Sequence, residues 1–180
     1  MDKKIVFPFS VDTSYYEGYS WASELAYKFG TNLLLFTTCK QKDESSLQKI
    51  FNSLLKAQGH YLQFVRNSRP LKTERFIETG DLIHPLLRFL QDKKNNNTII
   101  VIDPSFPVAD KAQLNEIIDT ASGVVVLSSE LSVATNDPEG DFYEKLRTAE
   151  LYKLPNDFFD TLSHDRSVFN YLRNFFKKKK

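Results

Sequence analysis

The chain has 180 residues, of which 41% are hydrophobic and 26% charged, and its net charge at pH 7 is +1. This composition is ordinary for a folded globular domain and excludes an intrinsically disordered chain. A single cysteine, Cys39, excludes an intramolecular disulfide framework and a cysteine-rich zinc site. No signal peptide and no apolar run long enough to cross a membrane is apparent, so we expect a cytoplasmic protein.

The charge is unevenly distributed. Residues 166–180 contain six basic residues and no acidic one, which leaves 18 basic and 23 acidic residues in the rest of the chain. The body is therefore mildly acidic, and we expect only the tail to attract a polyanion.

The first part of the chain predicts a strand, a helix and a strand. The apolar run at residues 5–9 indicates a buried strand, and residues 12–14 offer side-chain oxygens that can cap a helix. Apolar residues spaced by three and four predict that helix over 15–29, and Gly30 favours its end. A second buried strand is predicted over 33–38.

The middle of the chain continues this alternation. A second helix is predicted around residues 47–61, and a third strand at 75–78 is closed by Gly80. Asp81 is expected to cap a helix whose apolar face includes Ile83 and Leu90. The remaining predicted elements are a polar loop at 93–97, a central strand at 98–102, a helix at 112–120 and a strand at 124–127.

Strands that alternate with helices in this way imply parallel crossovers. The sequence therefore predicts an α/β fold, a doubly wound five-stranded parallel sheet with helices on both faces, plus a C-terminal helical extension. Turn-forming residues at 136–141 mark the expected boundary between a domain at 1–134 and an extension at 135–180. Helices are expected at 142–151 and 167–176 of this extension.

Candidate ligand-binding residues follow the predicted strands, because the carboxyl ends of parallel strands form the crevice where α/β proteins bind ligands. They are Ser10, Asp12, Thr38 and Asp103. The two acidic residues can bind a ribose hydroxyl or Mg²⁺. The favoured interpretation is that Asp12 caps a helix and that Asp103 opens a turn with Pro104. No glycine-rich phosphate loop is present.

No catalytic group stands out. The three histidines, His60, His84 and His164, lie on separate elements without a second metal ligand at the required spacing. Cys39 has Lys40 beside it, which can lower a thiol pKa, yet a packing role at the strand end is favoured. We therefore expect no enzyme activity, no metal and no cofactor.

Two surfaces are candidates for interaction. The last predicted strand, with Val124, Val125 and Val126, would be an exposed edge, which favours a homodimer through that strand; coverage by the C-terminal segment is the alternative. For the aromatic and basic tail from Ser167, the favoured interpretation is a helix that packs on the domain. The alternative is that this tail binds an anionic membrane or a nucleic acid.

Residues 4–38 resemble the opening of universal stress proteins, with Phe7-Pro8 and the run from Leu25-Ala26 to Gly30 as the matching residues. Residues 78–81 (Glu-Thr-Gly-Asp) resemble the turn after that family's third strand. The resemblance covers residues 3–133 and implies an adenine nucleotide alpha hydrolase-like sheet.

The departures from this family affect its nucleotide site. Nucleotide-binding members have an aspartate at the end of the first strand, where this chain has Ser10, and a G-x-x-G loop after the fourth strand, where it has Asp103-Pro104-Ser105-Phe106-Pro107. The resemblance therefore implies a non-enzymatic, dimeric stress-response or regulatory protein that does not bind ATP in the family's usual way. The alternatives are a cryptic ATP or AMP binder that uses the same cleft, and a membrane or nucleic-acid binder that uses the basic tail.

Overall fold

The computed structural model describes residues 3–13, 16–64, 72–95, 97–103, 105–107, 111–126, 150–151 and 174–177. Its strands are β1 (Lys4–Pro8), β2 (Asn32–Cys39), β3 (Thr73–Thr79), β4 (Thr98–Ile102), β5 (Gly123–Val126) and β6 (Glu150–Leu151). Its helices are α1 (Glu17–Lys28), α2 (Glu44–Phe64), α3 (Ile83–Gln91) and α4 (Lys111–Thr120), with a 3₁₀ turn, η1, at Lys93–Asn95.

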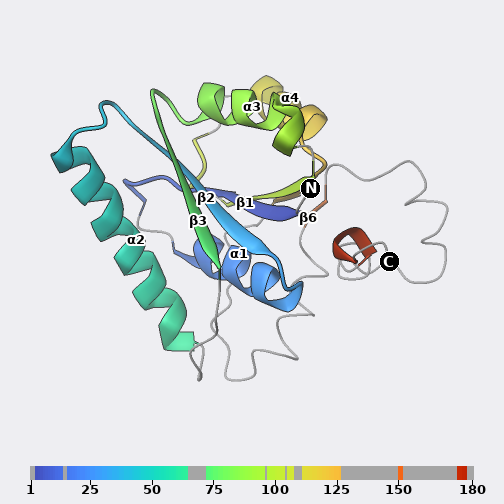
Figure 1. Ribbon diagram of the computed structural model, residues 1–180, viewed down its shortest axis with the longest axis horizontal. Helices are drawn as coiled ribbons and strands as arrows, with labels where there is room; N and C mark the ends of the chain where they lie inside the picture. The colour runs from blue at the N-terminus through green and yellow to red at the C-terminus, as the bar shows by residue number, and fades with distance from the viewer. Residues whose placement is uncertain are drawn as a thin grey trace.

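These strands form one sheet in the order β3-β2-β1-β4-β5-β6. The first five strands are parallel, and the strand order reverses between β1 and β4. Helices α1 and α2 cover one face of the sheet and α3 and α4 cover the other (Figure 1). The predicted α/β fold with a doubly wound five-stranded parallel sheet is thus confirmed, and β6 adds a short antiparallel strand to it.

The sheet separates two hydrophobic cores. All five residues of β4 are buried, and they alternate between the two faces. Ile99 and Val101 join the core beneath α1 and α2, whereas Ile100 and Ile102 join the core beneath α3 and α4. This alternation follows from the period of two along a strand and explains why β4 is apolar at every position except Thr98.

Local signals set two of the described helix ends. Gly30 has a φ of +59°, the left-handed conformation that ends α1, and its N–H donates to the carbonyl of Tyr27. Asp81 Oδ1 accepts the backbone N–H groups of Ile83 (3.0 Å) and His84 (2.9 Å), which confirms the predicted cap of α3. The start of α1 differs from the prediction, since the helix begins at Glu17 with no side-chain cap.

Two short parts of the 135–180 region are described, and both lie against the α/β domain. Glu150 and Leu151 are a strand, where a helix was expected, and residues 174–176 are helical, as predicted for the end of the chain. The ring of Phe176 stacks on Phe29 with centroids 5.3 Å apart. The predicted boundary at 134/135 and the helix over 142–149 lie outside the described residues.

The expected open edge at β5 needs a correction. The backbones of Val125 and Val126 pair with Leu151 and Glu150, so β6 supplies hydrogen-bond partners that we had expected from a second copy. Val124 is fully buried in the core beneath α3 and α4. At these residues the structure agrees with the alternative interpretation, in which the C-terminal segment covers the strand edge. The homodimer itself stays a prediction.

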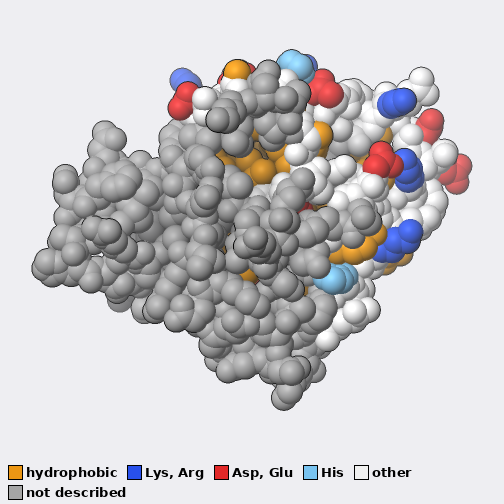
Figure 2. All heavy atoms as spheres, turned by 180° about the vertical axis from the view of Figure 1, so that it is seen from behind, with side chains coloured by type: hydrophobic (Ala, Val, Ile, Leu, Met, Phe, Trp, Pro, Cys, Tyr) orange, Lys and Arg blue, Asp and Glu red, His pale blue; other side chains and the backbone are white. Residues whose placement is uncertain are grey.

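The surface of the described residues carries both signs of charge. Seen from behind, acidic and basic side chains lie interspersed along one margin, with hydrophobic side chains between them (Figure 2). None of the helices within the described ranges is long and apolar enough to span a membrane. The same residues contain no group of three or more His, Cys, Asp or Glu side chains that could hold a metal ion.

Candidate functional site

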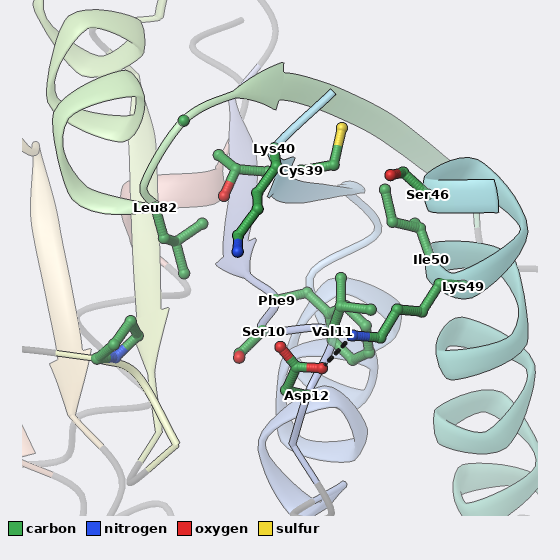
Figure 3. A pocket seen from close by; sticks show the side chains of 13 residues that line it. Phe9, Ser10, Val11, Asp12, Cys39, Lys40, Ser46, Lys49, Ile50 and Leu82 are labelled. Atoms are coloured by element: carbon green, nitrogen blue, oxygen red, sulfur yellow. Dashed lines mark hydrogen bonds and ion pairs between the residues drawn. The ribbon is translucent and has the colours of Figure 1, made fainter. Parts of the chain in front are cut away.

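A cleft of about 400 Å³ opens at the carboxyl ends of β1, β2 and β3 (Figure 3). We call it the strand-end cleft. The residues that line it are Phe9, Ser10, Val11, Asp12, Thr38, Cys39, Lys40, Ser46, Lys49, Ile50, Gly80, Leu82 and Pro107.

Backbone hydrogen bonds hold the strand ends that form this cleft together. Phe9 continues β1 by donating its N–H to the carbonyl of Phe36 (2.7 Å), and Gly80 donates to the carbonyl of Cys39 (3.0 Å). The hydroxyl of Ser53 on α2 donates to the carbonyl of Val11 (2.9 Å), which ties the β1–α1 loop to α2. The walls of the cleft are therefore fixed by the sheet and by α2.

The charged side chains of the cleft are Asp12, Lys40 and Lys49. Lys49 Nζ lies 2.5 Å from Asp12 Oδ1 in a pair whose side chains are 65% and 79% exposed, respectively. The side chain of Lys40 points into the space between this pair and Leu82 (Figure 3). Because Lys49 already neutralises Asp12, Lys40 gives the open part of the cleft a positive charge.

Three of the four predicted ligand-binding residues meet in this cleft, and for one of them, Asp12, the favoured interpretation as a helix cap is wrong. Ser10, Asp12 and Thr38 all line it. Asp12 does not cap α1, because its carboxylate pairs with Lys49 of α2 instead. Ser10 accepts the N–H of Thr13 through its backbone carbonyl (3.3 Å), so the β1–α1 loop turns immediately after β1.

The fourth predicted residue, Asp103, is not among the residues that line the cleft. It is 3% exposed, and its Oδ1 accepts both the backbone N–H (2.9 Å) and the hydroxyl (2.6 Å) of Ser105. Its carbonyl accepts the N–H of Phe106 (3.0 Å). These bonds make Asp103 the opener of a turn after β4, which was the favoured interpretation.

The Asp103 carboxyl group also packs against the first turn of α1. A Cβ added at Gly18 would lie 2.6 Å from the Cβ and Cγ of Asp103, closer than real side-chain contacts allow. A glycine is therefore required at this point of α1. The Asp103 carboxyl group thus lies against α1 beside the crevice between β1 and β4, where doubly wound proteins commonly bind ligands.

The cleft lacks a recognisable nucleophile and base pair among its described lining residues. Cys39 Sγ lies 3.7 Å from the carbonyl of Glu78, a packing role at the end of β2. The ring of His60 lies against Tyr16 with centroids 5.9 Å apart, and His84 contacts Asp81. His164 lies outside the described residues.

The β3–α3 turn places a second carboxylate next to the cleft. Asp81 lies between Gly80 and Leu82, which both line it. The backbone N–H of His84 lowers the pKa of the Asp81 carboxyl group, because the hydrogen bond favours the charged form. Asp81 is thus engaged in capping α3 rather than in binding.

Sequence reasoning missed Lys49 and considered Lys40 only as a neighbour of Cys39. Lys49 lies 37 residues beyond Asp12, and no periodic pattern relates the two positions. The position of Lys40 directly after a buried strand was the available signal, since side chains at that point face the crevice of a parallel sheet.

No protein-family model matches this chain. No curated protein matches it either. Among solved structures, the universal stress protein UspA from Lactobacillus plantarum is similar in fold, at 17% sequence identity and a TM-score of 0.42. The match covers 70% of this chain and 96% of that chain. The fold class assigned here is based on the strand order and connections described above.

Proposed function

We propose that this chain is a non-enzymatic regulatory protein of the universal-stress type, that it acts in a stress response as a homodimer, and that it does not bind ATP in that family's usual way. The observation that carries the proposal is the position of Asp103, whose buried carboxyl group packs against the first turn of α1.

The physical argument concerns the anion-binding end of α1. A helix N-terminus favours a negative charge, which is how α/β proteins commonly hold a phosphate group. The Asp103 carboxyl group already lies against Gly18 in the first turn of α1. A phosphate brought to the same place would overlap the Asp103 side chain, so ATP binding in this half of the crevice is disfavoured.

A second candidate function is binding of a small anion, such as AMP, in the strand-end cleft. It is favoured by Lys40, whose side chain points into that cleft, and by the pairing of Lys49 with Asp12, which leaves no unneutralised acid among the described lining residues. This candidate uses the β1–β3 side of the crevice and leaves the contact between Asp103 and Gly18 intact.

The first experiment is to denature freshly purified protein and to identify the released small molecules by mass spectrometry. The proposal expects no nucleotide, and it expects millimolar ATP to change the melting temperature by less than about 1 °C. Co-purified ATP, or a shift of several degrees, would overturn it.

The second candidate is tested by a matched pair of variants, Lys40→Gln and Lys42→Gln, which each remove one positive charge from exposed positions two residues apart. Stabilisation by AMP that is lost in Lys40→Gln and kept in Lys42→Gln would support binding in the strand-end cleft. Equal effects of the two variants would contradict it.

The homodimer is tested by light scattering on the purified chain. The expected mass is twice that of the 20.8 kDa monomer. A monomer at all accessible concentrations would remove this part of the proposal and leave the regulatory function of a single chain to be tested.

A further inference from the structure

Lysine side chains gather at the end of the sheet opposite the strand-end cleft. Parallel strands begin at a common edge, and Lys4 begins β1, Lys72 precedes β3, and η1 leads towards β4. The short C-terminal helix lies on this side of the molecule, away from the carboxyl ends of the strands (Figure 1). We call this surface the lysine edge; its members are Lys3, Lys4, Lys72, Lys93, Lys94 and Lys177.

Only part of this positive charge is neutralised by neighbouring carboxylates. Lys4 is engaged, because its Nζ lies 2.6 Å from Glu74 Oε2. This hydrogen bond is the main reason that the pKa of Glu74 is lowered. Asp92 Oδ1 accepts the backbone N–H of Lys94 (3.0 Å), and Asp119 lies near the end of α4. The described part of the edge thus holds six lysines and three carboxylates.

The lysines that remain are accessible. Lys72, Lys93, Lys94 and Lys177 are all exposed, whereas Lys3 and Lys4 are partly buried. Neighbouring strands lie about 4.8 Å apart, so the starts of β3, β2, β1 and β4 span about 15 Å. The positive charges of the exposed lysines are therefore spread along the edge of the sheet rather than concentrated at one point.

The contacts of Phe175 and Phe176 fix the end of the chain to this edge. Lys3 Nζ donates to the carbonyl of Phe175 and lies 4.9 Å from the centroid of its ring. Phe176 stacks on Phe29, and both rings pack against the core beneath α1 and α2. Lys177, the first of four consecutive lysines in the sequence, therefore leaves the body beside Lys3.

We propose that the lysine edge binds the surface of an anionic lipid bilayer. A cluster of four to eight basic residues suits such a surface, and each lysine close to it strengthens binding by about fivefold. The inference is independent of the ligand and of the regulatory function proposed above, since it uses the opposite end of the sheet.

Two observations favour a bilayer over a nucleic acid. The basic residues at this edge are lysines, which act as point charges, apart from Arg88 of α3, which lines a pocket with Lys4 and Lys94. Base and phosphate recognition in nucleic acids commonly uses the planar fork of arginine. The rings of Phe175 and Phe176 are engaged with Lys3 and Phe29, so stacking on bases would require them to leave the protein core. Lipid headgroups require neither feature.

The test uses the full chain and two double variants that each remove two exposed positive charges. The double variant Lys72→Gln with Lys93→Gln alters the lysine edge. The control is Lys42→Gln with Lys56→Gln, in which Lys42 lies in the loop between β2 and α2 and Lys56 lies on α2. Binding is measured by co-sedimentation with phosphatidylcholine vesicles that contain about one-third phosphatidylserine, and with pure phosphatidylcholine vesicles. A 30-base-pair duplex DNA of mixed sequence (roughly three helical turns) is measured in parallel.

The expected result is binding to the anionic vesicles alone, about 25-fold weaker in the lysine-edge variant and changed less than twofold in the control. Raising the salt from about 0.1 M to about 1 M, which shortens the screening length from about 10 Å to about 3 Å, should release the protein. Absence of vesicle binding, equal weakening by the two double variants, or tighter binding to the DNA than to the vesicles would each overturn the proposal.

Discussion

The two halves of the crevice at the carboxyl ends of the strands differ in what fills them. Between β1 and β4, where doubly wound proteins commonly bind ligands, the buried side chain of Asp103 packs against Gly18. Across the ends of β1, β2 and β3, a cleft of about 400 Å³ stays open, with Lys40 pointing into it. Within one sheet, a buried side chain thus packs at one pair of strand ends, while the neighbouring strand ends leave a cleft open.

The filled half is tested most strongly by Gly18→Ala. The added Cβ would overlap the Cβ and Cγ of Asp103, so we expect the free energy of unfolding to fall by about 3 kcal/mol. Urea denaturation measures this loss. The double variant Gly18→Ala with Asp103→Gly removes the overlapping atoms and should recover part of it, whereas no destabilisation by Gly18→Ala would contradict the contact.

Asp103→Ala should have the next largest effect. It leaves the N–H and hydroxyl of Ser105 without their acceptor in a partly buried turn, so we expect a loss of about 1 kcal/mol in urea denaturation. Asp103→Asn keeps an acceptor oxygen and is the matched control, with a smaller loss. If both variants are equally destabilised, the charge of Asp103 matters more than its hydrogen bonds.

At the open half, Asp81→Ala removes the cap of α3 beside the cleft and should cost about 1 kcal/mol at pH 7. The pKa of Asp81 is lower in the folded state than its ordinary value of 3.8, chiefly because of the backbone N–H of His84. Its stabilisation is therefore present above that value and disappears as the pH falls through the folded pKa.

Urea denaturation across pH 2 to 7 measures this dependence (roughly the range in which carboxyl groups titrate). The difference between wild type and Asp81→Ala should shrink at the acid end. Asp81→Asn keeps an acceptor for the cap but does not titrate, so it is the matched variant. A stability difference between wild type and Asp81→Ala that is independent of pH would contradict the assignment.

The smallest effect is expected from Asp12→Asn. The pair with Lys49 is largely exposed, so its loss should change the free energy of unfolding by at most about 0.5 kcal/mol. Removing this carboxylate also frees Lys49, so an anion that binds in the cleft should bind more tightly. Calorimetric titration with AMP checks this, and weaker binding by the variant would argue against Lys49 as part of the site.

The parts of the fold that sequence patterns predicted well are those in which each residue is determined locally. β4 was predicted at its observed bounds, because a strand buried on both faces is a nearly continuous apolar run. Gly30 and Asp81 marked helix ends, because a left-handed conformation and a side-chain cap depend on only a few neighbouring residues.

The unpredicted parts depend on residues far apart in the sequence. The packing of Asp103 against Gly18 and the pairing of Asp12 with Lys49 leave no periodic signal, because each requires the folded sheet to bring two loops or helices together. The helical spacing around residues 142–151 was overridden at Glu150 and Leu151, which pair with the backbone of β5. Tertiary hydrogen bonding decided the conformation there, and local preference did not.

The stacking of Phe176 on Phe29 has a consequence for synthesis on the ribosome. All strands from β1 to β5 leave the ribosome well before residue 176, and a nascent domain commonly begins to fold once its own residues have emerged. Until Phe175 and Phe176 arrive, their contacts with the core beneath α1 and α2 cannot form. A ribosome that stalls between residues 126 and 174 would therefore hold a partly completed domain, a target that chaperones and proteases can distinguish from the finished one.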